Sequence, residues 1–177
     1  MMEDLSLHIL DLVENAASAG ARRVAVSVTE SDARDRLVIR VADDGRGMSG
    51  TEKARAFDPF FTTGRKRTGL GLPLLAHTAE ACDGRVSLDS VPGHGARVVA
   101  VFRLGHVDRP PLTRMASTMM TLIFGHPDLT LTYRHSRNGR VFRYLRTGGA
   151  AGAALSPAAV RRADSKLREG LRRIGAD

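Results

Sequence analysis

The chain is short of several residue types, and each shortage excludes a class of protein. Its single cysteine, Cys82, excludes an internal disulfide and a cysteine-based zinc site, and is typical of a reducing cytoplasm. Tryptophan is missing and other aromatic residues are few. No apolar run approaches the roughly 20 residues that a membrane-spanning helix needs, so we expect no membrane insertion. The acidic start at Glu3 and Asp4 is unlike a secretory signal.

The net charge of +8 is unevenly distributed. Residues 1–106 hold 14 basic and 14 acidic residues, whereas residues 107–177 hold 13 basic and 5 acidic residues. Such asymmetry is typical of a surface for nucleic acid or for an acidic protein. However, 24 of the 27 basic residues are arginines in an alanine-rich chain, as a GC-rich coding sequence would produce. Nucleic-acid binding is therefore the less favoured interpretation.

Hydrophobic periodicity predicts helices that alternate with pairs of strands. The predicted helices span 5–19, 51–56, 69–82, 112–124 and 158–174. The predicted strands span 23–29, 37–42, 85–90, 96–102, 129–133 and 141–145. Asn138-Gly139 predicts a tight hairpin turn between the last two strands. We therefore expect an α+β fold, with helices on one face of a mostly antiparallel sheet.

A boundary is expected at the Arg109-Pro110-Pro111 stretch. It separates a first region, residues 1–106, from a small basic C-terminal region of αββα pattern, residues 107–177. The unpaired edges of the C-terminal hairpin could pair with a second copy, which predicts a homodimer as one oligomeric state. The C-terminal region itself matches no catalytic pattern.

Three short patterns could carry chemistry. Asp11 and Asn15 lie one turn apart on the first helix, and their oxygens suit Mg²⁺, although such residues are ordinarily a solvated helix face. Asp43-Asp44-Gly45-Arg46-Gly47-Met48 follows a strand, and its glycines let the backbone approach a ligand, although such turns are common at surfaces. Thr68-Gly69-Leu70-Gly71-Leu72 opens a helix, where backbone amides bind anions or form an ordinary cap.

The order of these patterns resembles the GHKL ATPases, a superfamily that includes DNA gyrase, the heat-shock chaperone ATPase, histidine kinases and mismatch-repair MutL. The similar stretches are residues 10–17, 43–48, 57–64 (with Phe57-Asp58-Pro59-Phe60-Phe61), 68–72 and 93–97. Together they cover about residues 5–104. The resemblance implies a Bergerat-type two-layer α/β sandwich that binds ATP and Mg²⁺.

The resemblance also implies a role for each matching residue. Asn15 would ligate Mg²⁺, and Asp43 would accept a hydrogen bond from the adenine amino group. Gly45 and Gly47 would shape the adenine pocket. The phosphates would be held by amides of the segment Thr68, Gly69, Leu70, Gly71 and Leu72. Lys66 or Arg65, on a short lid, would neutralise γ-phosphate charge.

Two positions depart from the family pattern. Asp11 stands where relatives that transfer or hydrolyse phosphate carry a glutamate, so its role as general base is an expectation. Ala96 stands where the family usually has threonine, which predicts weaker nucleotide affinity. His8, within the first helix, is interpreted as structural and not as a phosphoacceptor.

Three functions follow, in order of preference. The first is an ATP-dependent protein kinase or kinase subunit in signalling, directed at a histidine or serine of a separate partner protein. Few residues precede the first helix, so the dimerisation domain of histidine kinases is expected to be absent. The arrangement looks like stand-alone bacterial ATP-binding proteins associated with iron-hydrogenase gene sets.

The second possible function is an ATP-gated binding module with slow turnover. The third is a nucleic-acid-binding protein with relic motifs.

Overall fold

The computed structural model describes residues 4–59, 61, 70–149 and 156–176. Its strands are β1 (Arg23–Ser31), β2 (Arg36–Asp43), β3 (Arg85–Ser90), β4 (Ala96–Arg103), β5 (Thr130–Arg137) and β6 (Arg140–Arg146). Its helices are α1 (Leu5–Ser18), α2 (Gly50–Arg55), α3 (Gly71–Glu80), α4 (Met115–Gly125) and α5 (Pro157–Ile174). Every predicted helix and strand is present, with its ends shifted by a few residues.

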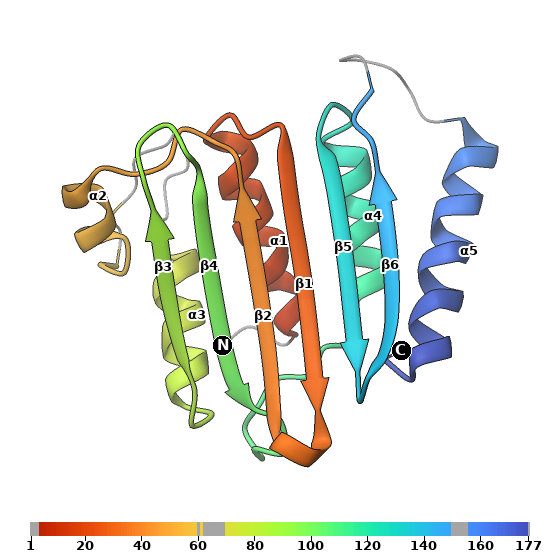
Figure 1. The fold of residues 1–177 in the computed structure, drawn as a ribbon, viewed down its shortest axis with the longest axis horizontal. Helices are drawn as coiled ribbons and strands as arrows, with labels where there is room; N and C mark the ends of the chain where they lie inside the picture. The colour runs from red at the N-terminus through yellow and green to blue at the C-terminus, as the bar shows by residue number, and fades with distance from the viewer. Residues whose placement is uncertain (1–3, 60, 62–69, 150–155, 177) are drawn as a thin grey trace.

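The strands form one six-stranded sheet in the order β3-β4-β2-β1-β5-β6. All neighbouring strands are antiparallel except β1 and β5, which run parallel. Helices α1, α3 and α4 lie on the same side of the sheet (Figure 1). The predicted α+β class, with helices on one face of a mostly antiparallel sheet, is confirmed. None of the helices within the described ranges combines the length and apolarity needed to cross a membrane.

The C-terminal region extends the same sheet. β5 pairs with β1 along its whole length, from Arg23 opposite Thr130 to Glu30 opposite Arg137. The expectation that both edges of the C-terminal hairpin could accept a second copy therefore needs correction. The β5 edge is occupied by β1 of the same chain, and β6 is left at the edge of the sheet.

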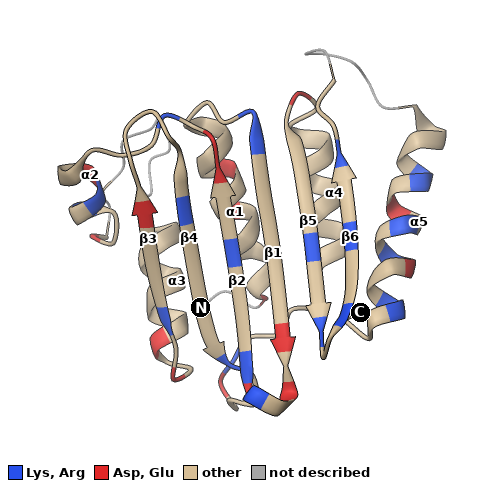
Figure 2. Ribbon diagram, in the orientation of Figure 1, with Lys and Arg blue, Asp and Glu red and all other residues tan. Residues whose placement is uncertain are grey.

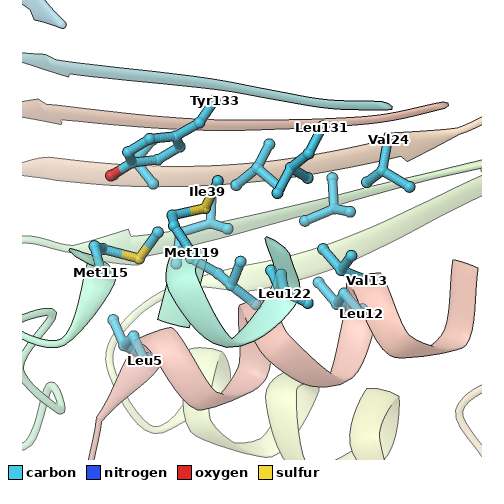
Figure 3. Packing of buried hydrophobic residues seen from close by; sticks show 14 of the residues in the cluster. Leu5, Leu12, Val13, Val24, Ile39, Met115, Met119, Leu122, Leu131 and Tyr133 are labelled. Atoms are coloured by element: carbon cyan, nitrogen blue, oxygen red, sulfur yellow. The ribbon is translucent and has the colours of Figure 1, made fainter. Parts of the chain in front are cut away.

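Both regions of the chain also share one hydrophobic core. Leu5, Leu12 and Val13 of α1 and Met119 and Leu122 of α4 are buried together against the sheet (Figure 3). Fully burying a side chain of this size contributes about 1.5–3 kcal/mol, so the core that α1 and α4 build is a large part of the stability. The predicted boundary at Arg109–Pro111 falls in the connection between β4 and α4.

That connection also fixes the beginning of α1. The buried carboxylate of Asp4 caps the helix by accepting a hydrogen bond from the Ser6 amide at 2.8 Å. Its other oxygen accepts from the Thr113 amide at 3.0 Å and the Thr113 hydroxyl at 2.8 Å. The Leu5 amide donates to the Pro111 carbonyl at 2.8 Å. The position of α1 therefore depends on residues more than a hundred positions later.

Candidate functional site

Two polar side chains of α1 face the start of α3. A methyl group in place of a hydrogen of Gly71 would lie 3.6 Å from Cβ of Asp11 and 3.7 Å from both Oδ2 of Asp11 and Nδ2 of Asn15. Gly71 is the first residue of α3, and no side chain within the described ranges caps that helix. A carboxylate and a carboxamide thus stand beside the backbone amides of a helix N-terminus. Such a site offers oxygen ligands to a cation and N–H donors to an anion.

The glycine loop after β2 packs against the end of α1 and against the β3–β4 turn. The Gly45 amide donates to Oδ1 of Asp43 at 2.8 Å, and a Cβ on Gly45 would lie 3.0 Å from the Ala19 carbonyl. Gly47 has φ +67°, and a Cβ there would overlap the Val91 carbonyl oxygen. Gly45 and Gly47 therefore let the loop pack closely against its own chain. Their predicted close approach to a ligand stays a prediction.

Asp43 ends β2 with a half-buried carboxyl group. Burial raises the pKa of Asp43 above its ordinary value, the amides of Gly45 and Ala96 oppose the rise, and the neighbouring Asp44 carboxylate adds to it. Ala96 thus contributes its backbone amide to this carboxyl group, although its side chain cannot hydrogen-bond. The two amides orient the Asp43 carboxyl group. Because this acceptor is half-buried, leaving it without a further hydrogen-bond partner costs free energy.

Ser90 is a site residue that the motifs do not reveal. Its hydroxyl accepts a hydrogen bond from the Met48 amide at 2.9 Å and donates to the Gly95 carbonyl at 2.7 Å. Gly95 has φ +76°, and a Cβ there would overlap the Asp43 carbonyl oxygen. Ser90 therefore links the glycine loop to the β3–β4 turn. A single serine at a strand end gives no signal in the sequence, because its partners lie on two separate loops.

A second contact that the sequence motifs do not reveal joins α1 to the end of α4. Nε2 of His126 lies 2.9 Å from Oε1 of Glu14, the residue that precedes Asn15. His126 is the C-cap of α4. The two residues are 112 positions apart, so no local pattern could have paired them.

Several predicted site residues lie outside the described residues. Lys66, Thr68 and Gly69 are among them, as is the alternative lid cation Arg65. Leu70 and Leu72 are described, partly buried on either side of Gly71. The phosphate-binding role of this segment therefore stays a prediction, supported at the one position, Gly71, that lies against Asp11 and Asn15.

His8 is buried within α1 at 1% exposure. Neither ring nitrogen has a hydrogen-bond partner among the described residues, and burial lowers the pKa of His8 to about 4. In this conformation the imidazole is shielded from solvent, in keeping with the structural role expected for it.

Part of the sequence is similar to part of several bacterial sensor and sporulation kinases. It is 35% identical over 89 residues to sensor histidine kinase ZraS of Escherichia coli O157:H7, covering 50% of this chain and 19% of ZraS. It is 35% identical over 89 residues to the alginate biosynthesis sensor protein KinB of Pseudomonas aeruginosa, covering 49% and 15%. Sporulation kinase C of Bacillus subtilis is 29% identical over 95 residues, covering 54% and 22%. The matched part is between 15% and 22% of the length of these relatives.

The fold is shared with solved structures of low sequence identity. The Aquifex aeolicus MutL ATPase domain, solved with ADP, superimposes with a TM-score of 0.59 at 13% identity, covering 96% of this chain and 70% of that one. The N-terminal domain of a DNA repair protein also has a TM-score of 0.59 at 13% identity, covering 97% and 59%. These matches show the architecture and include the C-terminal strands.

A family match extends over more than half of the chain. Residues 3–106 fit the family described as histidine kinase-, DNA gyrase B-, and HSP90-like ATPase, and this range includes α1, the glycine loop and α3. The chain therefore belongs to the histidine kinase-, DNA gyrase B- and HSP90-like ATPase family, a GHKL ATPase.

Proposed function

We propose that this protein binds magnesium-ATP and transfers the γ-phosphate to a separate partner protein. The observation that carries the proposal is the convergence of Asp11 and Asn15 on Gly71, at the N-terminus of α3. Membership in the ATPase family favours ATP as the bound nucleotide. The similar proteins that are named as kinases favour phosphoryl transfer as the reaction. A role in cytoplasmic signalling belongs to the same proposal.

Asp43 is the residue suited to recognise adenine. Its carboxyl group is oriented by two backbone amides and is half-buried, so an amino group of a bound base would supply a further hydrogen-bond partner. Gly45 and Gly47 form the loop beside it, where any side chain would meet backbone atoms. These residues fit a flat purine whose exocyclic amine points at Asp43.

Asn15 and Gly71 are suited to hold the phosphate end. Magnesium in nucleotide sites usually keeps water and phosphate oxygens as ligands and takes only one or two from the protein. The side-chain oxygen of Asn15 could supply one such ligand, and bound magnesium would neutralise phosphate charge. The amides at the start of α3 would donate to the phosphates. Lys66, Thr68 and Gly69 remain proposed phosphate contacts.

Asp11 is the proposed general base. It lies one turn before Asn15 and beside the same helix N-terminus. If the acceptor is a hydroxyl, Asp11 would take its proton as the oxygen attacks the γ-phosphorus, and ADP would leave. Aspartate is one methylene shorter than the glutamate typical of the resembling ATPases, so the acceptor must approach α1 closely.

An ATP-gated binding module is the second candidate, and two contacts favour it. Glu14 beside Asn15 touches His126, and Asp4 at the start of α1 binds Thr113. Both link the helix of the nucleotide site to residues after position 106. A change at the site on nucleotide binding would therefore reach the C-terminal region without turnover.

The variant Asp11→Asn separates the two candidates. We expect it to bind an ATP analogue with an affinity close to that of the wild type, because the amide is nearly isosteric. ADP production should fall by roughly 10²–10⁴-fold, the usual contribution of a general base. Glu80→Gln, at the exposed end of α3, is the matched control and should keep both properties. Undiminished turnover in Asp11→Asn would remove Asp11 from this role, and nucleotide binding without any wild-type turnover would favour the binding module.

A further inference from the structure

The face of the sheet opposite α1, α3 and α4 is covered by no helix in the described part of the chain (Figure 1). Successive strand residues point to alternate faces, and the alternating buried residues of β1, β2, β4 and β5 mark the helix side. Val38 and Ser136 are also buried, although they occupy positions of the other face. The remaining alternate residues therefore belong to the open face.

Arginine dominates this open face. We use the term arginine face for the set Arg23, Arg36, Arg40, Arg85, Arg97, Arg103, Arg134 and Arg143, which come from all six strands of the sheet. Figure 2 shows blue bands for Lys and Arg on neighbouring strands of the sheet. Asp89 of β3, which lies opposite Arg97 of β4, is the single acidic residue at the open-face positions of the described strands. Asp35 and Asp83 pair with Arg103 from outside the strands.

Three of these arginines form a row across the sheet. Arg40 of β2 lies opposite Ser27 of β1, Ser27 lies opposite Arg134 of β5, and Arg134 lies opposite Arg143 of β6. Adjacent strands are about 4.8 Å apart, and like charges placed directly opposite each other destabilise a sheet. The Arg134–Arg143 pair is therefore unfavourable for folding by itself.

No acid within the described ranges forms an ion pair with this row, which consists of Arg40, Arg134 and Arg143. Of the residues outside the described ranges, 60, 62–69 and 150–155 contain no Asp or Glu, and the acidic ones are Glu3 and Asp177, near the two ends of the chain. The charge is thus available to a second molecule.

The surroundings of the arginines favour a protein over a nucleic acid. Val99 and Val101 are partly buried on this face, and Leu145 is 62% exposed. The strand aromatics point the other way and are buried, so the face offers no platform on which bases could stack: Phe102, Tyr133, Phe142 and Tyr144. Arginine mixed with apolar residues, without lysine, is typical of protein interfaces.

We propose that the arginine face is the docking surface for a partner protein that presents acidic and apolar side chains. This inference rests on the proposed function, because it assigns a docking surface to the separate partner protein, whose phosphate-accepting or nucleotide-sensing part would have to extend past the edge of the sheet to α1. Asp11 and Asn15 face α3 on the helix side of the sheet, so the docking surface and the nucleotide site lie on opposite sides.

The test compares two variants that lose the same charge. The face variant is Arg40→Ser/Arg134→Ser/Arg143→Ser, and the control is Arg161→Ser/Arg162→Ser/Arg173→Ser on the exposed surface of α5. Each full-length protein is titrated against a fluorescent acidic peptide of Glu, Ala and Leu, and against a random-sequence DNA duplex at the same salt. The face variant should bind the peptide at least roughly tenfold more weakly than the wild type, and the control within about twofold.

Thermal melting and titration with an ATP analogue accompany the binding assay. The face variant should melt no lower than the wild type, because it relieves the Arg134–Arg143 repulsion. If it does not fold, Arg143→Ser is compared with Arg161→Ser in the same way. Nucleotide binding should be unchanged in both variants, so failure of the nucleotide site and failure of the docking surface are separate results.

Three results would overturn the proposal. The first is no peptide binding by the wild type. The second is an equal loss of binding in the face variant and the α5 control. The third is face-dependent binding that is tighter for the duplex than for the peptide, which would assign the surface to nucleic acid.

Discussion

Asp43, the residue proposed to recognise adenine, has a cost for stability of its own. Its carboxyl group is half-buried, and that burial raises the pKa of Asp43. The folded protein therefore keeps the Asp43 proton to a higher pH than the unfolded chain does. By linkage, the free energy of unfolding falls as the pH rises above the ordinary range of an aspartate and Asp43 ionises.

Asp43→Asn should consequently separate affinity from stability. The amide oxygen can still accept from Gly45, but a charged hydrogen bond to adenine is lost, so we expect about 10–100-fold weaker binding of an ATP analogue. The unfolding free energy near pH 7 should match or exceed that of the wild type, with the difference shrinking at acidic pH. Denaturant melts across pH check this. Wild-type affinity, or a loss of stability that is greatest near neutral pH, would contradict this role.

At the residue scale, local sequence patterns could identify only some of the residues of the candidate site. Helical periodicity placed Asp11 and Asn15 on one face, and the structure turns both toward Gly71. Ser90 and His126 could not be found, because the Met48 amide and the Glu14 carboxylate that they contact lie 42 and 112 residues away in the chain. Such pairs depend on tertiary packing.

At the scale of elements, turn chemistry was predictable and strand partners were not. Asn138 and Gly139 have φ of +48° and +85°, the pair of positive values that an Asn-Gly hairpin requires. Alternation of apolar residues correctly predicted six strands. It could not predict that β5 pairs in parallel with β1, because a strand's own pattern does not specify its neighbour across a long connection.

Two glycines of the β3–β4 turn provide a matched pair of variants. Both have positive φ, yet a Cβ on Gly95 would overlap the Asp43 carbonyl, whereas a Cβ on Gly93 would meet nothing within 4 Å. Gly93→Ala should cost about 1–2 kcal/mol of unfolding free energy from backbone strain alone. Gly95→Ala should cost about 3 kcal/mol or more, because overlap is added to the strain.

Gly95→Ala should also weaken nucleotide binding, because the displaced backbone is that of Asp43. Chemical denaturation and analogue titration of both variants measure the two effects. Equal losses in the two variants would show that the turn does not hold the glycine loop in place.

At the scale of the whole molecule, the residues of the proposed nucleotide site depend on the C-terminal region. Residues 1–106 fit the ATPase family, but β5 covers the edge of β1, and α4 completes the core around α1. The helix that carries Asp11 and Asn15 is also capped through Asp4 to Thr113. Family-level sequence similarity thus ends before the structural unit does.

A fragment of residues 1–106 should therefore fold poorly. It would expose the β1 edge and the apolar surface that Met119 and Leu122 cover, so we expect no cooperative melt and a tendency to aggregate. A fragment of residues 1–149, which keeps β5 and β6, is the milder control. Circular dichroism melts compare the two. A cooperative melt of residues 1–106 near the full-length temperature would make the C-terminal region a separate unit.

The central claim, a magnesium-nucleotide site between α1 and α3, is tested most directly by calorimetric titration with a non-hydrolysable ATP analogue, with and without Mg²⁺. The wild type should bind with an affinity that magnesium increases. Asn15→Ala should lose the magnesium dependence, and Ser18→Ala, on the same helix, should keep it. Absence of binding at millimolar analogue, or an unchanged magnesium effect in Asn15→Ala, would contradict the assignment of this site.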